Sequence, residues 1–237
     1  MENSKLTTKR ITKIAIVIIL VVWMLPGIVK LIASNILEIK QDDYGVFLGT
    51  VYYRKHNSSS PTNAVRLTRI RNVDSKSFIN LGSGCMKDRA NVICHGHPVS
   101  TVDVDSFKVH KVGNLNSRYA SDVEKVLCIN NLREINLKSE NLSVLSVKYA
   151  KDSESAAFNC EIFIPKDVNS LQYISGEFAK DKTAVYSGGR LIPNADPKTF
   201  VIDDPLFNYS HDENRFFKGT QEVSKVKFTE HMNLLKK

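Results

Sequence analysis

Glycine, proline and cysteine are all scarce in this sequence, and each shortage removes a class of protein. The 237 residues include 11 glycines, 7 prolines and 4 cysteines. These numbers exclude collagen and a disulfide-dense miniprotein, and the composition does not favour a coiled coil. Hydrophobic residues make up 42% and charged residues 24%, as in ordinary globular chains. The length therefore allows one or two folded domains with a sizeable core.

Sequence motifs for catalysis and cofactor binding are also missing. The glycine-dense points, residues 82–84 and 188–189, are not followed by the Lys-Ser/Thr ending of a phosphate-binding loop. We interpret both as turns. Six histidines are scattered, and no nucleophile has a recognisable partner base. We therefore assign no catalytic, cofactor-binding or metal-binding residue and expect a protein that is not an enzyme.

One long apolar run stands near the N-terminus. Residues 14–29 carry no charge, and the apolar character continues to residue 37 with Lys30, Ser34 and Asn35 as interruptions. A bilayer span needs about 20 largely apolar residues. Residues 14–37 are thus predicted to form a transmembrane signal-anchor helix. A cleaved signal peptide is the main alternative, with Leu31-Ile32-Ala33 as a poor cleavage site, and a buried soluble helix is a third.

The charges around this run predict its orientation. Lys5, Lys9, Arg10 and Lys13 precede it, against a single Glu2. Positive flanks stay on the cytoplasmic side. Residues 1–13 should therefore be a cytoplasmic stub, with residues 38–237 outside the cytoplasm. Of the net charge of +8, +3 lies in residues 1–13 and +1 on Lys30, so the remainder carries only +4. This mild excess does not suggest nucleic-acid binding.

An internal repeat follows the anchor. Two segments share residue types at offsets of 4, 11, 15 and 19 after an aspartate that follows a lysine. The first comprises Asp88, Val92, Val99, Asp103 and Phe107, and the second Asp181, Val185, Ile192, Asp196 and Phe200. Agreement at five positions is improbable by chance. A repeat must be considered before any other interpretation of the fold.

Weaker copies bring the total to six. They begin at Asp42, Asp122, Asp152 and Asp212, and a polar insertion at residues 54–68 lengthens the first. The second conserved polar position falls at Asp74, Asp103, Lys138, Asp167 and Asp196, which gives a period near 30 residues. The apolar position four residues later is expected in the core, as Phe78, Phe107, Leu142, Leu171 and Phe200.

The best-preserved copy resembles a known family. Its sequence over residues 178–186, FAKDKTAVY, and the later stretch over 195–200, ADPKTF, are similar to the DKNYY repeat family of bacterial envelope proteins. The resemblance is good over residues 178–203, fair over 86–110 and faint elsewhere. It implies a repetitive fold and an envelope location, here the bacterial inner membrane with the repeats in the periplasm. It implies no catalytic residues.

The physical character of the unit points to β structure. Aromatic and β-branched residues flank short polar turns, and Asp at a turn start bonds backbone amides two residues on. Each copy should give about three short strands whose apolar face is too small to be buried alone. We therefore predict an all-β solenoid or blade-like array of hairpin repeats after one transmembrane helix. A closed sandwich or barrel is the alternative.

The four cysteines fit two disulfides in an oxidising compartment. If residues 88–91 form a hairpin turn, Cys85 and Cys94 face each other, which leaves Cys128 for Cys160. Pairing of Cys94 with Cys128 is the second choice. Zinc binding by Cys85, Cys94, His95 and His97 is a further alternative, although the spacing matches no compact zinc unit. The aspartates of the repeat come singly, which favours turns over calcium binding.

The expected function follows from the repeat architecture. Residues 56–61 form a polar loop that could carry binding or be a solvated insertion. A repeat array favours binding of another envelope protein, or of an incoming toxin if this is an immunity protein. The alternatives are a structural envelope component and, with less support, an enzyme acting on peptidoglycan or lipid. No cofactor is expected.

Overall fold

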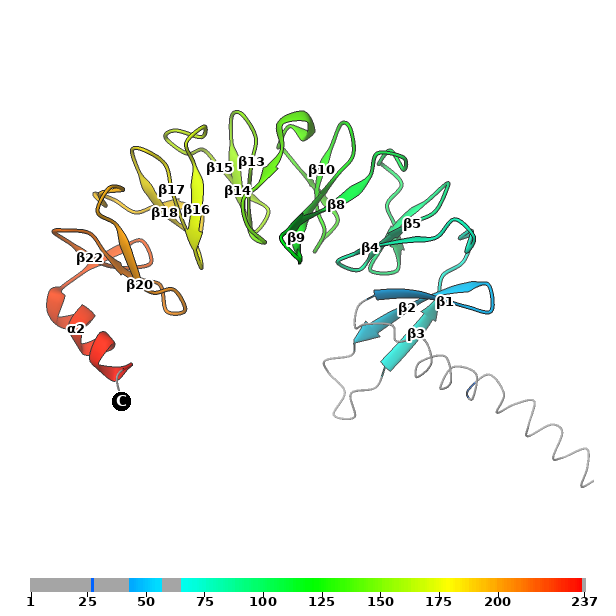
Figure 1. Cartoon of the computed structure of the whole chain (residues 1–237), viewed down its shortest axis with the longest axis horizontal. Helices are drawn as coiled ribbons and strands as arrows, with labels where there is room; N and C mark the ends of the chain where they lie inside the picture. The colour runs from blue at the N-terminus through cyan, green and yellow to red at the C-terminus, as the bar shows by residue number, and fades with distance from the viewer. Residues whose placement is uncertain (1–26, 28–42, 57–64, 236–237) are drawn as a thin grey trace, which may run out of the picture.

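The computed structural model describes residues 43–56 and 65–235, together with Gly27. In this part of the chain six small antiparallel sheets lie side by side in an open arc (Figure 1). No helix among the described residues has the length and apolar character needed to cross a membrane. The predicted span at residues 14–37 lies outside the described residues apart from Gly27, and so does most of the polar loop at 56–61.

We number the sheets 1 to 6 along the chain; the first has three strands and each of the others four. Sheet 1 contains β1 (Asp43–Phe47), β2 (Thr50–His56) and β3 (Val65–Arg69). Sheet 2 contains β4 (Ile79–Gly82), β5 (Cys85–Lys87), β6 (Val92–Cys94) and β7 (His97–Pro98). Sheet 3 contains β8 (Lys108–Val112), β9 (Leu115–Ser121), β10 (Val126–Cys128) and β11 (Arg133–Ile135).

The remaining sheets repeat this plan. Sheet 4 contains β12 (Ser143–Val144), β13 (Tyr149–Lys151), β14 (Ala156–Phe158) and β15 (Glu161–Phe163). Sheet 5 contains β16 (Gln172–Ser175), β17 (Phe178–Lys180), β18 (Val185–Ser187) and β19 (Arg190–Leu191). Sheet 6 contains β20 (Val201–Asp204), β21 (Tyr209–His211), β22 (Phe216–Lys218) and β23 (Gln221–Val223). A short 3₁₀ helix (Ser139–Asn141) precedes sheet 4, and helix α2 (Lys225–Leu234) follows sheet 6.

Each four-stranded sheet is an antiparallel meander, so its turns alternate between two ends. The turns after the first and third strands lie at one end, and the turn after the second strand lies at the other. In Figure 1, β16 and β20 run toward the inner side of the arc. We therefore call the end with the first and third turns the inner rim and the opposite end the outer rim.

The core consists of five apolar clusters, each between two consecutive sheets. Alternate residues of a strand point to opposite faces of the sheet. In sheet 5, Ala179 and Tyr186 pack toward sheet 4, whereas Phe178 and Val185 pack toward sheet 6. The middle strands are thus buried on both faces, which explains why they are apolar without alternating with polar residues.

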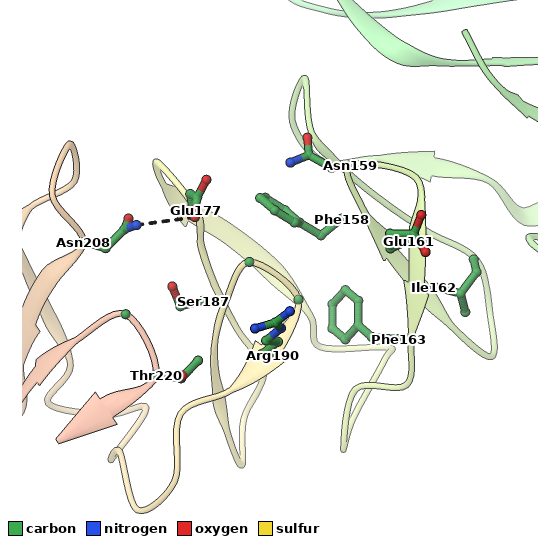
Figure 2. Close-up of a pocket in the computed structure, with 13 residues that line it drawn as sticks. Phe158, Asn159, Glu161, Ile162, Phe163, Glu177, Ser187, Arg190, Asn208 and Thr220 are labelled. Atoms are coloured by element: carbon green, nitrogen blue, oxygen red, sulfur yellow. Dashed lines mark hydrogen bonds between the residues drawn. The ribbon is translucent and has the colours of Figure 1, made fainter. Parts of the chain in front are cut away.

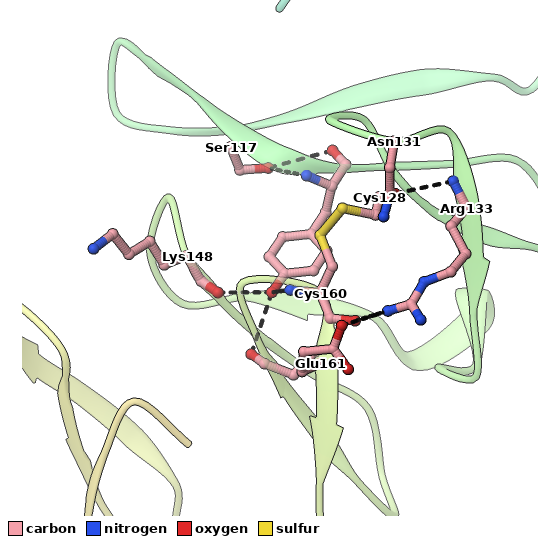
Figure 3. The surroundings of a disulfide bond; sticks show 9 residues. Ser117, Cys128, Asn131, Arg133, Lys148, Cys160 and Glu161 are labelled. Carbon is pink, nitrogen blue, oxygen red and sulfur yellow. Dashed lines mark hydrogen bonds and ion pairs between the residues drawn. A yellow bond between two sulfur atoms is a disulfide. The ribbon is translucent and has the colours of Figure 1, made fainter. Parts of the chain in front are cut away.

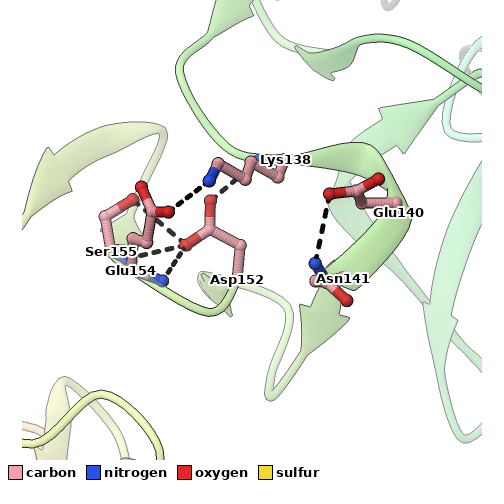
Figure 4. A network of polar contacts seen from close by, with 6 residues as sticks. All are labelled: Lys138, Glu140, Asn141, Asp152, Glu154 and Ser155. Atoms are coloured by element: carbon pink, nitrogen blue, oxygen red, sulfur yellow. Dashed lines mark hydrogen bonds and ion pairs between the residues drawn. The ribbon is translucent and has the colours of Figure 1, made fainter.

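The repeated aspartate holds the outer-rim turn, as predicted. One oxygen of Asp152 accepts hydrogen bonds from the amides of Glu154 and Ser155, at 2.8 and 2.7 Å, and the other accepts the amide of Lys138 at 2.7 Å (Figure 4). The same pattern recurs at Asp88, Asp122, Asp181 and Asp212. Each of these five carboxylates closes its own turn and fixes the segment that enters its own sheet.

The lysine before this aspartate links one sheet to the next. Lys151 Nζ donates to the carbonyl oxygens of Val168, Asn169 and Leu171, at 2.8, 2.8 and 3.1 Å, all in the segment that enters sheet 5. Lys87 makes the equivalent three bonds toward sheet 3, and Lys180 reaches Pro197 at 2.8 Å. The Lys-Asp pair is therefore a structural element that acts in both directions along the array.

The sequence repeat and the structural unit are out of phase. A copy counted from Asp88 or Asp181 covers the second half of one sheet and the entry to the next. The structural unit is one sheet of four strands, whereas the sequence predicted about three strands per copy. Of the predicted apolar column, Phe107, Leu171 and Phe200 are buried, while Phe78 and Leu142 are half-buried against the core. Asp42, the predicted start of the first copy, lies outside the described residues.

Helix α2 was not anticipated by the repeat, and it covers the end of the array. Sheet 6 has no following sheet, and Phe228 of the helix packs against Tyr209 and Phe216, with ring centroids 6.0 and 4.7 Å apart. His231 Nε2 lies 2.9 Å from a carboxylate oxygen of Asp204 and its ring stacks on Tyr209. The helix replaces the face that a seventh sheet would supply.

Both preferred disulfides are confirmed. Cys85 and Cys94 are opposite each other on β5 and β6, whereas Cys128 of sheet 3 joins Cys160 of sheet 4 (Figure 3). Cys128 lies on β10, whereas Cys160 lies in the turn after β14, with φ of 70°. Arg133 Nη2 donates to the Cys160 carbonyl at 3.0 Å. The second disulfide therefore adds a covalent link between two units that also meet through side-chain packing and hydrogen bonds.

Candidate functional site

The inner rim carries a row of equivalent positions, one before the second strand of each sheet. In sheets 4, 5 and 6 these are Lys148, Glu177 and Asn208. Their carbonyl oxygens accept hydrogen bonds from the amides of Asn159, Gly188 and Gly219, at 2.9, 2.8 and 2.7 Å. Because the structural contact uses only the backbone, the side chains of this row are free to differ from sheet to sheet.

Buried tyrosines join consecutive sheets along the same rim. Tyr149 of sheet 4 donates its hydroxyl proton to the Glu177 carbonyl at 2.7 Å and accepts the Gly189 amide at 3.1 Å. The Tyr119 hydroxyl of sheet 3 likewise donates to the backbone carbonyl oxygen of Lys148 in sheet 4, at 2.7 Å. Burial raises the pKa of Tyr119 to about 12, so its hydroxyl stays a donor at neutral pH. These tyrosines fix the spacing of the row.

Side chains of the row contact one another across three sheets. Lys148 Nζ lies 3.4 Å from one oxygen of Glu177, and Asn208 Nδ2 lies 3.4 Å from the other. Figure 2 shows Glu177 between Asn208 and the neighbouring sheet. A cation, an anion and an amide thus follow one another along the rim.

A groove of about 610 Å³ opens beside this row (Figure 2). It extends over the inner-rim turns of sheets 4, 5 and 6. Its walls include Glu177, Ser187 and Thr220, and its apolar side is formed by Phe158, Ile162 and Phe163. The groove is therefore assembled from three repeats and requires their stacking.

Two amide oxygens of residues beside this groove have no hydrogen-bond partner among the described residues. They are Oδ1 of Asn159, after β14, and Oδ1 of Asn208, before β21, and both atoms are buried. Buried polar atoms are nearly always paired in folded proteins, and an unpaired one costs about 1–3 kcal/mol. Because neither oxygen is accessible, this pair is a local cost of the fold and offers no contact to a ligand in the groove.

Of the described charged side chains that line the groove, the two carboxylates are in ion pairs and the guanidinium is not. Glu161 forms an ion pair with Arg133 at 2.8 Å, and Glu177 pairs with Lys148. Arg190 is exposed and has no ion-pair partner within the described part of the chain. Its guanidinium is thus available for a ligand.

Three glycines form part of the groove wall. Gly188, Gly189 and Gly219 have φ of 61°, 75° and 60°. A Cβ on Gly189 would lie 3.1 Å from atoms of both Phe158 and Phe163, so close packing requires glycine there. A Cβ on Gly219 would meet nothing within 4 Å. Gly219 is therefore required by its turn alone and faces open space.

The residues that the sequence singled out lie elsewhere, with one exception. Cys85 and Cys94 are consumed by their disulfide, the His95 ring nitrogen lies 3.3 Å from the Tyr53 hydroxyl, and His97 is exposed on β7. The repeated aspartates are on the outer rim. The exception is residues 188–189, predicted as a turn, which form that turn and also line the groove.

The groove residues were missed because they do not recur. Asn159 and Asn208 belong to different turns, and Glu177 occupies a position whose residue type changes in every sheet. The available signal was the position just before the aromatic start of the second strand. Comparison of Lys148, Glu177 and Asn208 there would have marked a variable surface row.

A family model identifies the chain more firmly than the partial sequence resemblance. The model of the DKNYY family matches residues 44–221. The chain belongs to the DKNYY family. The match begins in sheet 1 and ends in sheet 6, so the DKNYY region spans the whole array of sheets and stops before α2. Searches of curated proteins and of solved structures gave no significant match.

Proposed function

We propose that this DKNYY protein binds another protein through the inner-rim groove while anchored in the bacterial inner membrane. Residues 14–37 would form the single span, with residues 1–13 in the cytoplasm and residues 38–237 in the periplasm. The apolar run and its basic flank support this orientation. The two disulfides fit an oxidising compartment.

The lining of the groove carries the binding proposal. It combines the apolar side chains of Phe158 and Phe163 with the charged Arg190. A concave site with apolar walls and a few polar groups is the usual form of a binding site. The arrangement is built on rigid elements, because the Tyr149 hydroxyl and the Gly189 amide fix the turns around it. Such preorganisation favours recognition.

The same groove is poorly suited to proton transfer. Its two carboxylates, Glu161 and Glu177, each face a cation on the same rim. Neither histidine nor cysteine occurs among the described residues that line it. Hydrogen bonding to a partner, such as an envelope protein or an incoming toxin, is therefore the activity that this site supports best.

Site-specific photocrosslinking in intact cells tests the proposal. A photoreactive amino acid replaces Arg190 in the groove, or Lys182, which is exposed on the outer rim, as the matched control. We expect a discrete crosslinked protein from position 190 and none from position 182. Crosslinks from position 182 alone, or from neither position, would contradict binding through the groove.

A reporter fusion tests the topology separately. Alkaline phosphatase fused after Lys237 should be active, because it folds only outside the cytoplasm. A reporter that works only in the cytoplasm should be silent at the same position. The reverse pattern would overturn the proposed location while leaving the groove itself unaffected.

A further inference from the structure

We infer that a pocket on the outer rim between sheets 5 and 6 binds a multiply charged anion of the phosphate class through Lys180, Lys182 and Lys198. This pocket lies on the rim opposite the groove. The inference therefore goes beyond the proposed function and does not depend on it. It gives the array a second site, for a small charged group.

The pocket has a volume of about 560 Å³ and is formed by two consecutive repeats. Strand β17 ends at Lys180, and the outer-rim turn that follows includes Lys182. The segment that enters sheet 6 supplies Pro197 and Lys198. Gln172 of β16 also lines the pocket, opposite Lys180 in the strand register. Three lysines from two segments thus share one concave surface.

Lys180 differs from the equivalent lysines of other sheets in its hydrogen bonds. Lys87 and Lys151 each donate to three carbonyl oxygens of the next sheet's entry segment, which uses all three hydrogens of the ammonium group. Among the described residues Lys180 donates only to the Pro197 carbonyl, at 2.8 Å. Because Lys180 also lines the pocket, its two other hydrogens can bond a ligand there.

The other copies of the repeat lack this set of charges. The three copies that carry the lysine have Asp105, Asn169 and Lys198 eighteen residues after it. Lys182 and Lys198 are exposed, and their side chains form no hydrogen bond or ion pair with the described part of the chain. Their ammonium groups are therefore not used by the fold and are available to an anion.

The charge of the lining favours a ligand with more than one negative charge. Asp181 is the one carboxylate among the described lining residues, and its oxygens accept bonds from three backbone amides and from the Thr183 and Tyr186 hydroxyls. Three lysines against this carboxylate leave a net charge of +2. A phosphate group carries about −1.5 to −2 charges at neutral pH, and lysine is a common phosphate ligand.

The lining also indicates the source of the phosphate. Pro197 is the one side chain without a polar group among the described residues of the pocket. An acyl chain would find little apolar surface there. We therefore expect the phosphate of a soluble compound, and the experiment compares this source with a lipid headgroup.

Isothermal titration of the full-length protein tests the site. The protein is purified in dodecyl maltoside micelles, which contain no phosphate, and is titrated with pyrophosphate or with acetate. We expect one pyrophosphate to bind per chain and acetate to give no measurable binding. Lys182→Met and Lys198→Met should each weaken pyrophosphate binding at least tenfold, because each variant removes one ammonium group from the pocket.

Lys76→Met is the matched control. The Lys76 amide donates to the Asp74 carboxylate at 3.0 Å, in the same type of turn that holds Lys198. Lys76 is also exposed but lies outside the pocket. This variant should bind pyrophosphate like the wild type. The melting temperature of each variant checks that it remains folded.

Two phosphate monoesters distinguish the sources. Glycerol 3-phosphate and dihexanoyl phosphatidic acid, used below its micelle concentration, carry the same charged group, and only the second adds acyl chains. Equal affinities would support a soluble ligand. Tighter binding of the lipid would overturn that expectation and place the phosphate on a membrane lipid, with the anion site retained.

Three results would overturn the inference. These are absence of pyrophosphate binding, equal binding of acetate, and unchanged affinity in both Lys182→Met and Lys198→Met. None of them bears on the groove, because photocrosslinking from position 190 probes the opposite rim. Loss of that crosslink with intact pyrophosphate binding would remove the proposed function alone.

Discussion

The Tyr149 hydroxyl in sheet 4 donates a hydrogen bond to the backbone carbonyl oxygen of Glu177 in sheet 5, across 2.7 Å. This contact separates the structural role of the inner rim from its proposed binding role. The tyrosine and the backbone carbonyl hold two sheets together, whereas the Glu177 side chain points to the groove and takes no part in that bond. Side chains of the row can therefore vary without loss of the fold.

Removal of the Tyr149 hydroxyl should weaken the array. In Tyr149→Phe the Gly189 amide loses the acceptor that lies 3.1 Å away, and it remains at a packed interface. We expect the free energy of unfolding to fall by about 1–3 kcal/mol. Urea denaturation of the purified chain measures this. Tyr173→Phe is the control, because Tyr173 is 38% exposed, and an equal loss there would contradict the role of the Tyr149 hydroxyl.

Lys151 should contribute to stability beyond an ordinary surface lysine. Its ammonium group donates to three carbonyl oxygens of the next sheet's entry segment. Lys151→Met keeps most of the side-chain volume but leaves those oxygens without this donor. A loss of about 1.5–3 kcal/mol is expected from thermal or urea unfolding. Exposed Lys182→Met should be nearly neutral; similar losses in both variants would argue against an inter-sheet link.

The two disulfides should differ in their contribution. The Cys85–Cys94 bond closes a separation of 9 residues and the Cys128–Cys160 bond one of 32. By the loop-entropy model these lengths correspond to about 2.6 and about 3.7 kcal/mol. The paired serine variants of Cys128 and Cys160 should therefore unfold at lower urea than those of Cys85 and Cys94. The opposite order would show that loop closure does not govern the effect.

Acid should destabilise the protein through the outer-rim aspartates. Burial alone would raise the pKa of Asp181, but hydrogen bonds from the Tyr186 hydroxyl and from backbone amides outweigh it, so the pKa lies below its usual value. The other four repeat aspartates are lowered too. Since the folded pKa is depressed, this stabilisation is complete above the unfolded pKa of about 4 and is lost as the pH falls through the folded value.

Urea unfolding between pH 5 and pH 2 measures this dependence. The wild-type free energy of unfolding should fall steadily over that range. Asp181→Asn should be less stable at pH 5 and should show a shallower slope, by about one proton taken up on unfolding. A flat profile for the wild type would contradict the assignment of these carboxylates as paired anions.

The elements that recur in sequence were predictable, because they do the same structural work in every sheet. Asp181 holds its turn and Phe200 is buried, as the repeat indicated. The disulfide pairing followed from placing Cys85 and Cys94 on opposite sides of a turn. The phase of the unit was not predictable, because a periodic pattern does not show where one sheet ends and the next begins.

Helix α2 and the groove lay beyond the reach of the sequence for a different reason. Each occurs once, so no periodicity reveals it. Phe228 contributes to the fold only by covering the exposed face of the last sheet. Asn159 and Asn208 are 49 positions apart in the chain and share a groove only after three sheets have stacked.

The most direct test of the account compares partner capture by two glycine variants of the full-length protein. Gly219 and Gly113 both have positive φ and open space at the Cβ position, but only Gly219 lines the groove. Asparagine tolerates this backbone conformation, so Gly219→Asn should fold and place a side chain in the groove. We predict that the wild type and Gly113→Asn retain the same envelope protein, and that Gly219→Asn loses it at least tenfold with an unchanged melting temperature. Equal retention by all three proteins would contradict binding through the groove.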